Sequence, residues 1–272
     1  MSIKNILIIL KTNFISFLFC YSLFSYGKII KICADENEQI PYIIISEGSL
    51  KGIEIEIIDE ALKDPILKEK YKYEIDVMPW ARCLDSAKKG IYDGTINASY
   101  TEERAEFLNY PPQSGKNEKK PCSSDYKLYC GGYLVITQRN EKYEFDGNKK
   151  NLPIPVRVSR GYSVFKELEE IYKENLDIGK SDIVNVQKML RDKIGSVVAY
   201  IAFQNKINKI KNVKNKVKVN EVPYVMKSYF IPFSKESKIP KQDIDKIWEN
   251  IKKINQNENK MKKMYEKYSK YI

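Results

Sequence analysis

The strongest constraint on the fold is the order of strand-like and helix-like segments in the first third of the chain. Three strand patterns alternate with three helical patterns, in the order 28–36, 52–64, 72–78, 80–90, 92–99 and 101–108. Ile53, Ile57 and Ile58 recur at the spacing of one helix face, whereas residues 72–78 alternate as a strand does. This order favours an α/β fold with a mostly parallel sheet flanked by helices.

A second α/β unit follows a loop rich in proline and lysine. Its segments are a strand at 133–138, a strand, glycine turn and helix within 154–172, a helix at 181–193, and strands within 195–203 and 224–234. Two such units joined by two connections predict two lobes with a ligand cleft between them. We expect residues 28–132 to form lobe 1, completed by 226–272, and residues 133–225 to form lobe 2.

The first 27 residues have the pattern of a signal peptide. Lys4 and Lys11 precede an apolar stretch of 11 residues at 14–24, and small Ser25 and Gly27 follow it. We therefore expect export to the periplasm, with cleavage after Gly27. Two alternatives stay open, namely lipid attachment at Cys20 and an uncleaved anchor.

The remaining cysteines and the missing histidine limit the chemistry. Four cysteines in an exported chain predict two disulfides, in which Cys122 pairs with Cys130 across a short loop and Cys33 pairs with Cys83. With no histidine and no closely spaced cysteine pair, we expect neither a metal site nor a cofactor. The absent histidine also removes the commonest general base, so we expect no catalytic residue.

The chain is basic, with a formal charge of +11, and much of the excess is lysine in its last third. An anionic partner such as nucleic acid is one explanation. Arginine is scarce and no basic motif interleaved with aromatic residues occurs. The pattern favours a solvated lysine surface over nucleic-acid binding.

Residues 97–107 combine hydroxyls and one arginine at a predicted strand-to-helix junction. Asn97, Ser99 and Thr101 lie where backbone N–H groups are free, and Arg104 follows one helical turn later. A guanidinium braced in this way suits a carboxylate or another small oxyanion. In the local alternative, Thr101 only caps the helix and Arg104 pairs with a neighbouring glutamate.

The sequence resembles the family 3 extracellular solute-binding proteins, the polar amino acid receptors of ABC importers, which have the type II periplasmic binding fold. The resemblance is carried by residues 32–42, 50–62 and 78–111, and more weakly by 156–168 and 229–237. It implies that Asn97, Ser99, Thr101 and Arg104 grip the carboxylate of the ligand. It also implies that Pro79 and Trp80 begin a helix that lines the cleft, and that the turn at Gly161, Tyr162 and Ser163 adds backbone donors.

One position departs from the family pattern. Tyr200 stands where these receptors usually place an aspartate for the ligand's ammonium group, and no acid occurs between Gly195 and Gln204. Either Asp35 or Glu36 serves instead, or the ligand is not a standard α-amino acid. Other candidates are Arg82 as a second donor and a set of aromatic residues that either stack on the ligand or simply pack, namely Tyr42, Trp80, Tyr100, Tyr162 and Tyr200.

The resemblance implies an exported, monomeric solute-binding protein that captures a small carboxylate-bearing solute, such as an amino acid, and delivers it to an ABC permease. Two alternatives have the same fold. A sensory module would bind the solute without transport. A periplasmic dehydratase-like enzyme would need a general acid or base, for which Asp35, Glu36 and Glu38 are the candidates.

Overall fold

A computed structural model of the chain describes residues 27–46 and 49–271. Residues 1–26 of the predicted signal peptide, including Cys20, lie outside the described residues. Within the described part, no helix has the length and apolar character needed to cross a bilayer.

The first lobe is built on a five-stranded sheet in which β1 pairs in parallel with β4 and β5, while β13 pairs antiparallel with β5 and β7. Its strand order is β4 (Tyr71–Met78), β1 (Lys28–Asp35), β5 (Gly94–Thr95), β13 (Phe233–Ser234) and β7 (Leu108–Asn109). The helices of this part of the chain are α2 (Ile53–Leu62), α3 (Pro65–Lys70), α4 (Trp80–Lys88) and α5 (Glu102–Ala105). A small hairpin, β2 (Ile44–Ser46) with β3 (Ser49–Lys51), precedes α2.

The sequence explains where these helices begin. Gly52 precedes α2 at φ 130°, and a Cβ at this position would lie 2.2 Å from the Tyr42 carbonyl oxygen, so only glycine fits. Helix α2 ends at Leu62, and Pro65 lies beyond it. It stands at the start of α3, where the Asp64 carboxylate accepts the Ile66 N–H at 3.0 Å.

The second lobe is built on a six-stranded sheet. Its strand order is β10 (Leu176–Gly179), β9 (Val156–Ser159), β11 (Ser196–Tyr200), β8 (Tyr129–Gln138), β12 (Val217–Phe230) and β6 (Ala98–Ser99). Strands β9, β10 and β11 are parallel, and β8 and β12 are antiparallel to their neighbours, so the sheet is mixed. Its helices are α6 (Phe165–Tyr172), α7 (Asp182–Asp192) and α8 (Phe203–Ile207).

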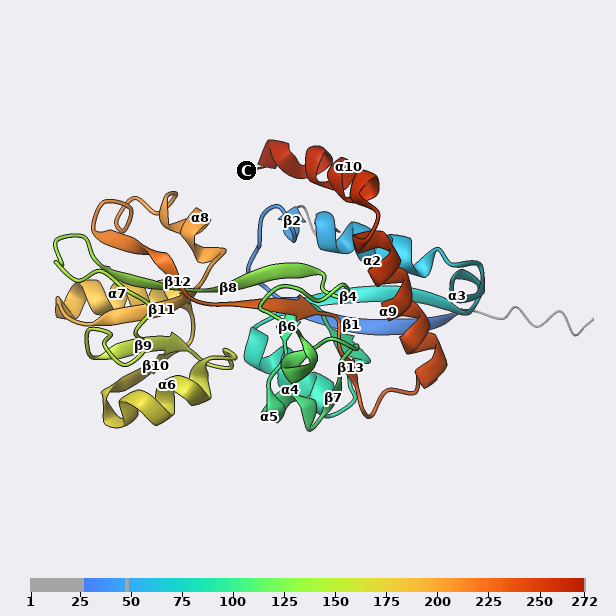
Figure 1. Ribbon diagram of the computed structural model, residues 1–272, viewed down its shortest axis with the longest axis horizontal. Coiled ribbons are helices and arrows are strands. Elements are labelled where there is room, and N and C mark those ends of the chain that lie inside the picture. Colours follow the sequence, from blue (N-terminus) through green and yellow to red (C-terminus); the bar gives the residue numbers. More distant parts are fainter. Residues whose placement is uncertain (1–26, 47–48, 272) are drawn as a thin grey trace, which may run out of the picture.

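The long strands β8 and β12 pass from one lobe into the other (Figure 1). After β12 the chain returns to the first lobe, where α9 (Lys241–Asn255) packs on α2 and α10 (Glu258–Tyr268) follows. Trp248 of α9 is buried in the first core and donates its indole N–H to the Ile231 carbonyl oxygen at 2.9 Å. The α/β fold class is confirmed. The lobe boundaries given above stay predictions, because β8 and β12 belong to both halves.

Both predicted disulfides are present. Cys33 of β1 is bonded to Cys83 of α4, and Cys122 is bonded to Cys130 of β8. The first bond fixes α4 against the sheet, and with it the position of Trp80 at the start of that helix.

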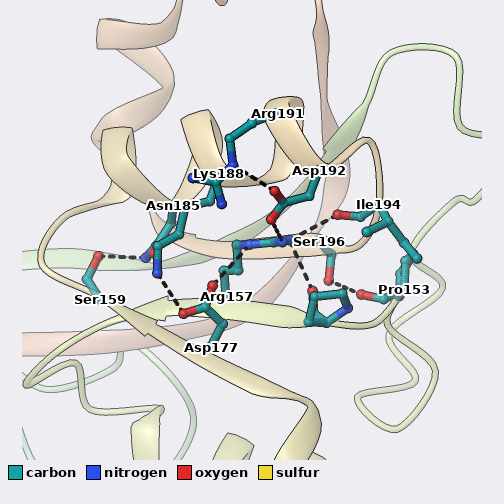
Figure 2. Close-up of polar contacts among 11 residues, drawn as sticks. Pro153, Arg157, Ser159, Asp177, Asn185, Lys188, Arg191, Asp192, Ile194 and Ser196 are labelled. Carbon is teal, nitrogen blue, oxygen red and sulfur yellow. Dashed lines mark hydrogen bonds and ion pairs between the residues drawn. The ribbon is translucent and has the colours of Figure 1, made fainter.

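A buried guanidinium holds the helix α7 in place in the second lobe (Figure 2). Arg157 of β9 is 1% exposed, and its Nη2 donates to the Asp192 carboxylate at 2.8 Å. It also pairs with Asp177 and donates to the Ile194 carbonyl oxygen. These contacts anchor the C-terminal end of α7, so they also fix where its N-terminal end lies.

We predict that Arg157→Met destabilises the protein by about 3 kcal/mol, because it removes a buried guanidinium together with its ion pairs to Asp177 and Asp192. Arg191→Met is the matched control, since Arg191 pairs with the same Asp192 from an exposed position and should cost less than about 0.5 kcal/mol. Urea unfolding measures both. Equal effects of the two substitutions would contradict the anchoring role of Arg157.

Candidate functional site

A cavity of about 700 Å³ lies between the lobes, and residues of both lobes line it. The first lobe contributes the end of β1, the start of α4, Asn97 and Arg104. The second lobe contributes Ser159, Tyr162, the start of α7 and the segment after β11. The cavity therefore lies at the carboxyl ends of parallel strands, as expected for this class of fold.

Arg104 reaches the cavity from the short helix α5 and is 5% exposed. Thr101 caps this helix, because its hydroxyl accepts the Arg104 backbone N–H at 3.1 Å. Arg104 Nη1 donates to the Ser99 carbonyl oxygen at 2.8 Å and lies 3.3 Å from the Ser99 hydroxyl. The guanidinium is thus fixed by residues of its own strand-to-helix junction.

The Gly161 carbonyl oxygen of the second lobe accepts two donors from the first lobe. Arg104 Nη2 donates to it at 2.8 Å, and Trp80 Nε1 donates to it at 3.0 Å. The Arg104 guanidinium also lies over the Trp80 ring, 5.3 Å from its centroid. Gly161 has φ 81°, and a Cβ there would lie 3.3 Å from the Trp80 ring.

Further hydrogen bonds join the lobes around the cavity. The Tyr200 hydroxyl lies 3.1 Å from Gln39 Oε1, and Lys206 Nζ lies 3.0 Å from Asn37 Oδ1. Together with the contacts at Gly161, they define a closed arrangement of the two lobes.

Asp182 supplies a second-lobe acid that sequence reasoning missed. It is the first residue of α7, and its carboxylate accepts the Ser159 hydroxyl at 2.6 Å, the Tyr162 hydroxyl at 2.8 Å and the Tyr200 N–H at 3.0 Å. Burial raises its pKa to about 6 despite these donors. The only signal in the sequence was an acid at the second position of the helix predicted at 181–193, a pattern common at ordinary helix starts.

Asp35 faces the same cavity from the end of β1. One of its oxygens, Oδ1, accepts both the backbone N–H and the side-chain amide of Asn37 at 2.7 Å. Burial raises the pKa of Asp35, and the charge of Asp35 contributes to the raised pKa of Asp182. Glu36 and Glu38 also line the cavity. Two partly desolvated carboxylates on opposite lobes therefore create a place for a cationic group.

Some of the predicted site residues line the cavity, and others lie behind those that do. Trp80, Asn97, Arg104, Tyr162 and Tyr200 line the cavity. The side chains of Ser99 and Thr101 support Arg104 from behind, and Ser163 Oγ lies 3.3 Å from the Tyr133 hydroxyl. None of these three hydroxyl residues is among those lining the cavity.

Three further candidates lie away from the cavity lining. Tyr42 packs on Tyr129, with 4.1 Å between ring centroids, and against Tyr265, because α10 covers this side of the first lobe. The hydroxyl of Tyr100 donates to Glu102 at 3.0 Å. Arg82 is exposed on α4. Among the described residues, no group of three or more acids and cysteines could hold a metal ion.

Comparison with known proteins shows the fold. No family profile matches the sequence, and no curated protein is similar to it. A histidine kinase sensor domain with similarity to periplasmic binding proteins is similar in structure, with TM-score 0.68 and 13% identity over 89% of this chain and 96% of that domain. The arginine-, lysine-, histidine-binding protein ArtJ from Geobacillus stearothermophilus gives TM-score 0.64 and 17% identity over 89% of this chain and 95% of ArtJ.

A third similar structure is the ancestral amino acid-binding protein AncCDT-1, described as a precursor of cyclohexadienyl dehydratase. It gives TM-score 0.60 and 13% identity over 88% of this chain and 94% of that chain. At these identities the likeness establishes the two-lobed architecture of periplasmic binding proteins. The resemblance to the solute-binding proteins is confirmed at this level.

We predict that Gly161→Ala lowers stability by about 1–2 kcal/mol, since alanine at φ 81° is strained and its methyl group pushes on Trp80. Trp80 is one of two tryptophans, so the emission spectrum should shift to the red as its ring leaves the interlobe contact. Gly147→Ala is the control, because Gly147 has φ 94° but nothing within 4 Å of the added Cβ. It should lose only about 1 kcal/mol and leave the emission unchanged. A shift of equal size in both variants would contradict the contact.

Proposed function

We propose that the protein is a solute-binding protein that captures a small solute carrying both a carboxylate and a cationic group. The observation that supports this most is the distribution of charge in the closed cavity. A buried guanidinium, Arg104, lines the cavity from the first lobe, and the carboxylates of Asp35 and Asp182 line it from opposite lobes. No chemical step is needed for this function, only closure around the ligand.

The carboxylate of the solute binds at Arg104. In the closed structure Arg104 Nη2 donates to the Gly161 carbonyl oxygen. A ligand oxygen therefore binds to the guanidinium beside this carbonyl oxygen, or replaces it. The paired N–H groups of arginine match a carboxylate and hold it by two charge-assisted hydrogen bonds. Trp80 bounds this end of the cavity.

The cationic group of the solute lies between Asp35 and Asp182. Without a ligand, the two carboxylates repel each other, and each has lost part of its hydration. A cation between them neutralises both, so the closed arrangement becomes more favourable when the solute is bound. This accounts for the missing acid at Tyr200, whose backbone N–H instead supports Asp182.

Export and delivery to an ABC permease complete the proposal. The signal-peptide pattern and the two disulfide bonds support an oxidising compartment outside the cytoplasm, such as the periplasm. The likeness to ArtJ and to the substrate binding protein of an amino acid ABC transporter supports transport. We expect the protein to act as a monomer.

Two other functions have a structural neighbour in their favour. The kinase sensor domain favours ligand sensing without transport. The AncCDT-1 precursor, together with a cavity acid whose pKa is about 6, favours a dehydratase-like enzyme. Genes for a permease and an ATPase beside this gene would support transport, whereas a kinase gene would support sensing. Turnover of a cyclic carboxylic acid by the purified protein would support the enzyme.

We predict that Arg104→Ala abolishes ligand-induced stabilisation while the protein stays folded. A thermal-shift screen of amino acids, dicarboxylates and other small acids, each at saturating concentration, identifies ligands on the wild-type chain. A solute at 100 times its dissociation constant stabilises by about 2.7 kcal/mol, which such a screen detects. The control is Arg82→Ala on the exposed face of α4, which should respond as wild type does. An Arg104→Ala protein with a full ligand response would show that the anion is bound elsewhere.

The affinity for a cationic solute should depend on the protonation of Asp182. The cation binds the ionised carboxylate, so affinity is constant above pH about 6 and falls by up to about ten-fold per pH unit below it. Isothermal titration calorimetry between pH 4.5 and 8 measures this dependence. The Asp182→Asn variant should bind the cationic solute weakly at every pH, and its affinity should depend less on pH. Affinity that rises toward low pH would mean that the ligand carries no cationic group at this position.

A further inference from the structure

A buried carboxyl group that the proposed function does not use, that of Glu54, lies next to the cavity-lining Asn97. Glu54 is the second residue of α2 and is 0% exposed. Neither of its oxygens has a hydrogen-bond partner among the described residues, and the same is true of Asn97 Oδ1. The Asn97 side chain lies beside Glu54 and lowers its pKa, which offsets part of the increase that burial causes. Three oxygen atoms without a hydrogen-bond partner in the described structure thus belong to two neighbouring side chains.

Asn97 is connected to the second lobe through Gln39. Asn97 Nδ2 donates to Gln39 Oε1, which is the oxygen that the Tyr200 hydroxyl meets from the second lobe at 3.1 Å. Asn97 and Gln39 both line the cavity and are nearly buried. Asn97 also has φ 64°, a left-handed backbone conformation that positions its amide away from the usual strand direction.

We propose that Glu54 carries a proton and acts as a positioning residue, which pairs with the Asn97 amide and thereby orients Gln39 to receive the Tyr200 hydroxyl of the opposite lobe. A protonated carboxyl group has one O–H donor and one free carbonyl oxygen, and an asparagine amide has two N–H donors and one acceptor. Glu54 O–H donates to Asn97 Oδ1, and one Asn97 N–H donates to the other Glu54 oxygen. The second Asn97 N–H is then the one directed at Gln39. A single proton therefore satisfies all three unpaired oxygens.

The surroundings of Glu54 favour the neutral form. The titratable groups that face it are Tyr42 from the loop before β2, Tyr129 from β8 and Tyr200 from the end of β11, with Tyr265 of α10 behind Tyr42. No cation is among the groups that alter its pKa, and burial raises that pKa to about 8. An ionised Glu54 would have only acceptors to offer Asn97 Oδ1, and the amide would have to turn away from Gln39.

The protonation state is measured on the wild-type protein without any ligand, so the result is independent of the proposed solute. Infrared spectroscopy at pH 7 should show the carbonyl stretch of a protonated, buried carboxyl group, and this band should be absent from Glu54→Gln. Asp182, whose pKa is about 6, is mostly ionised at this pH, and any band that it contributes remains in Glu54→Gln. Absence of the band from wild-type protein would overturn the proposal, even if every variant failed to fold.

The pH dependence of thermal stability gives a second measurement. The unfolded chain releases the Glu54 proton near pH 4.5 and the folded protein near pH 8, so its contribution to stability declines as pH rises between these values. The contribution of Asp182 to this pH dependence ends near pH 6. Burial lowers the pKa of Lys227 to about 8, so Lys227 contributes a pH dependence only above about pH 8. The melting temperature should therefore fall between pH 6 and 8 in wild type and in the exposed control Glu69→Gln, but not in Glu54→Gln. Parallel profiles for wild type and Glu54→Gln would contradict a proton on Glu54.

The positioning role is tested by a double-mutant cycle with Tyr200→Phe at pH 7. Glutamine can reproduce both hydrogen bonds to Asn97, so Tyr200→Phe should lower the melting temperature as much in Glu54→Gln as in wild type. Methionine fills the same space without hydrogen bonds, so most of this loss should disappear in Glu54→Met. An undiminished effect of Tyr200→Phe in Glu54→Met would overturn the link between the buried acid and the interlobe contact.

Discussion

The site depends on one carbonyl oxygen, that of Gly161, which accepts the guanidinium of Arg104 and the indole N–H of Trp80 from the other lobe. Each donor is held in place by a separate set of contacts. Arg104 is fixed by Ser99 and by the helix that Thr101 caps, and Trp80 begins a helix that the Cys33–Cys83 bond ties to β1. The acceptor is fixed by a left-handed backbone that favours glycine. Closure of the lobes therefore brings together parts that are already oriented.

The closed cavity is lined by buried charges of both signs. The guanidinium of Arg104 is only partly neutralised by backbone and hydroxyl oxygens, and two carboxylates, Asp35 and Asp182, have lost part of their hydration. Three donors reduce the cost of burying Asp182, yet its pKa remains above the usual value, so the donors do not fully replace water. The free energy stored in these groups is released when a solute supplies the opposite charges.

The sequence was most informative where a function is confined to one short segment. Residues 97–104 follow each other through a single strand-to-helix junction, so the support of Arg104 by Ser99 and Thr101 could be inferred from their spacing. The two cysteine pairs and the order of strands and helices could be predicted for the same reason, because each rests on local pattern or simple elimination. The antiparallel course of β8 and β12, which makes the six-stranded sheet mixed, left no comparable local signal.

Features that depend on how separate segments dock could not be predicted. Asp182 enters the cavity because Arg157 anchors the far end of its helix while Ser159 holds the near end, and these contacts join residues 35 and 23 positions apart. Tyr42 turns away from the cavity because α10, more than 200 residues later in the chain, supplies Tyr265 to pack on it. Glu54 looks like one of several acids on an amphipathic helix. Only the fold shows that α2 places this acid beside the cavity-lining Asn97.

These features together argue for a solute that carries both charges. A simple carboxylic acid can bind Arg104, but it leaves the charges of Asp35 and Asp182 uncompensated in a closed cavity. A simple cation relieves the repulsion between the acids, but the guanidinium then keeps only the oxygens of Gly161 and Ser99 and the Trp80 ring as the neighbours described above. A solute with both groups satisfies the two ends at once, and its length must match the distance between them. Selectivity would then come from the charges left unpaired by the wrong ligand, because an uncompensated buried charge costs more than a paired one contributes.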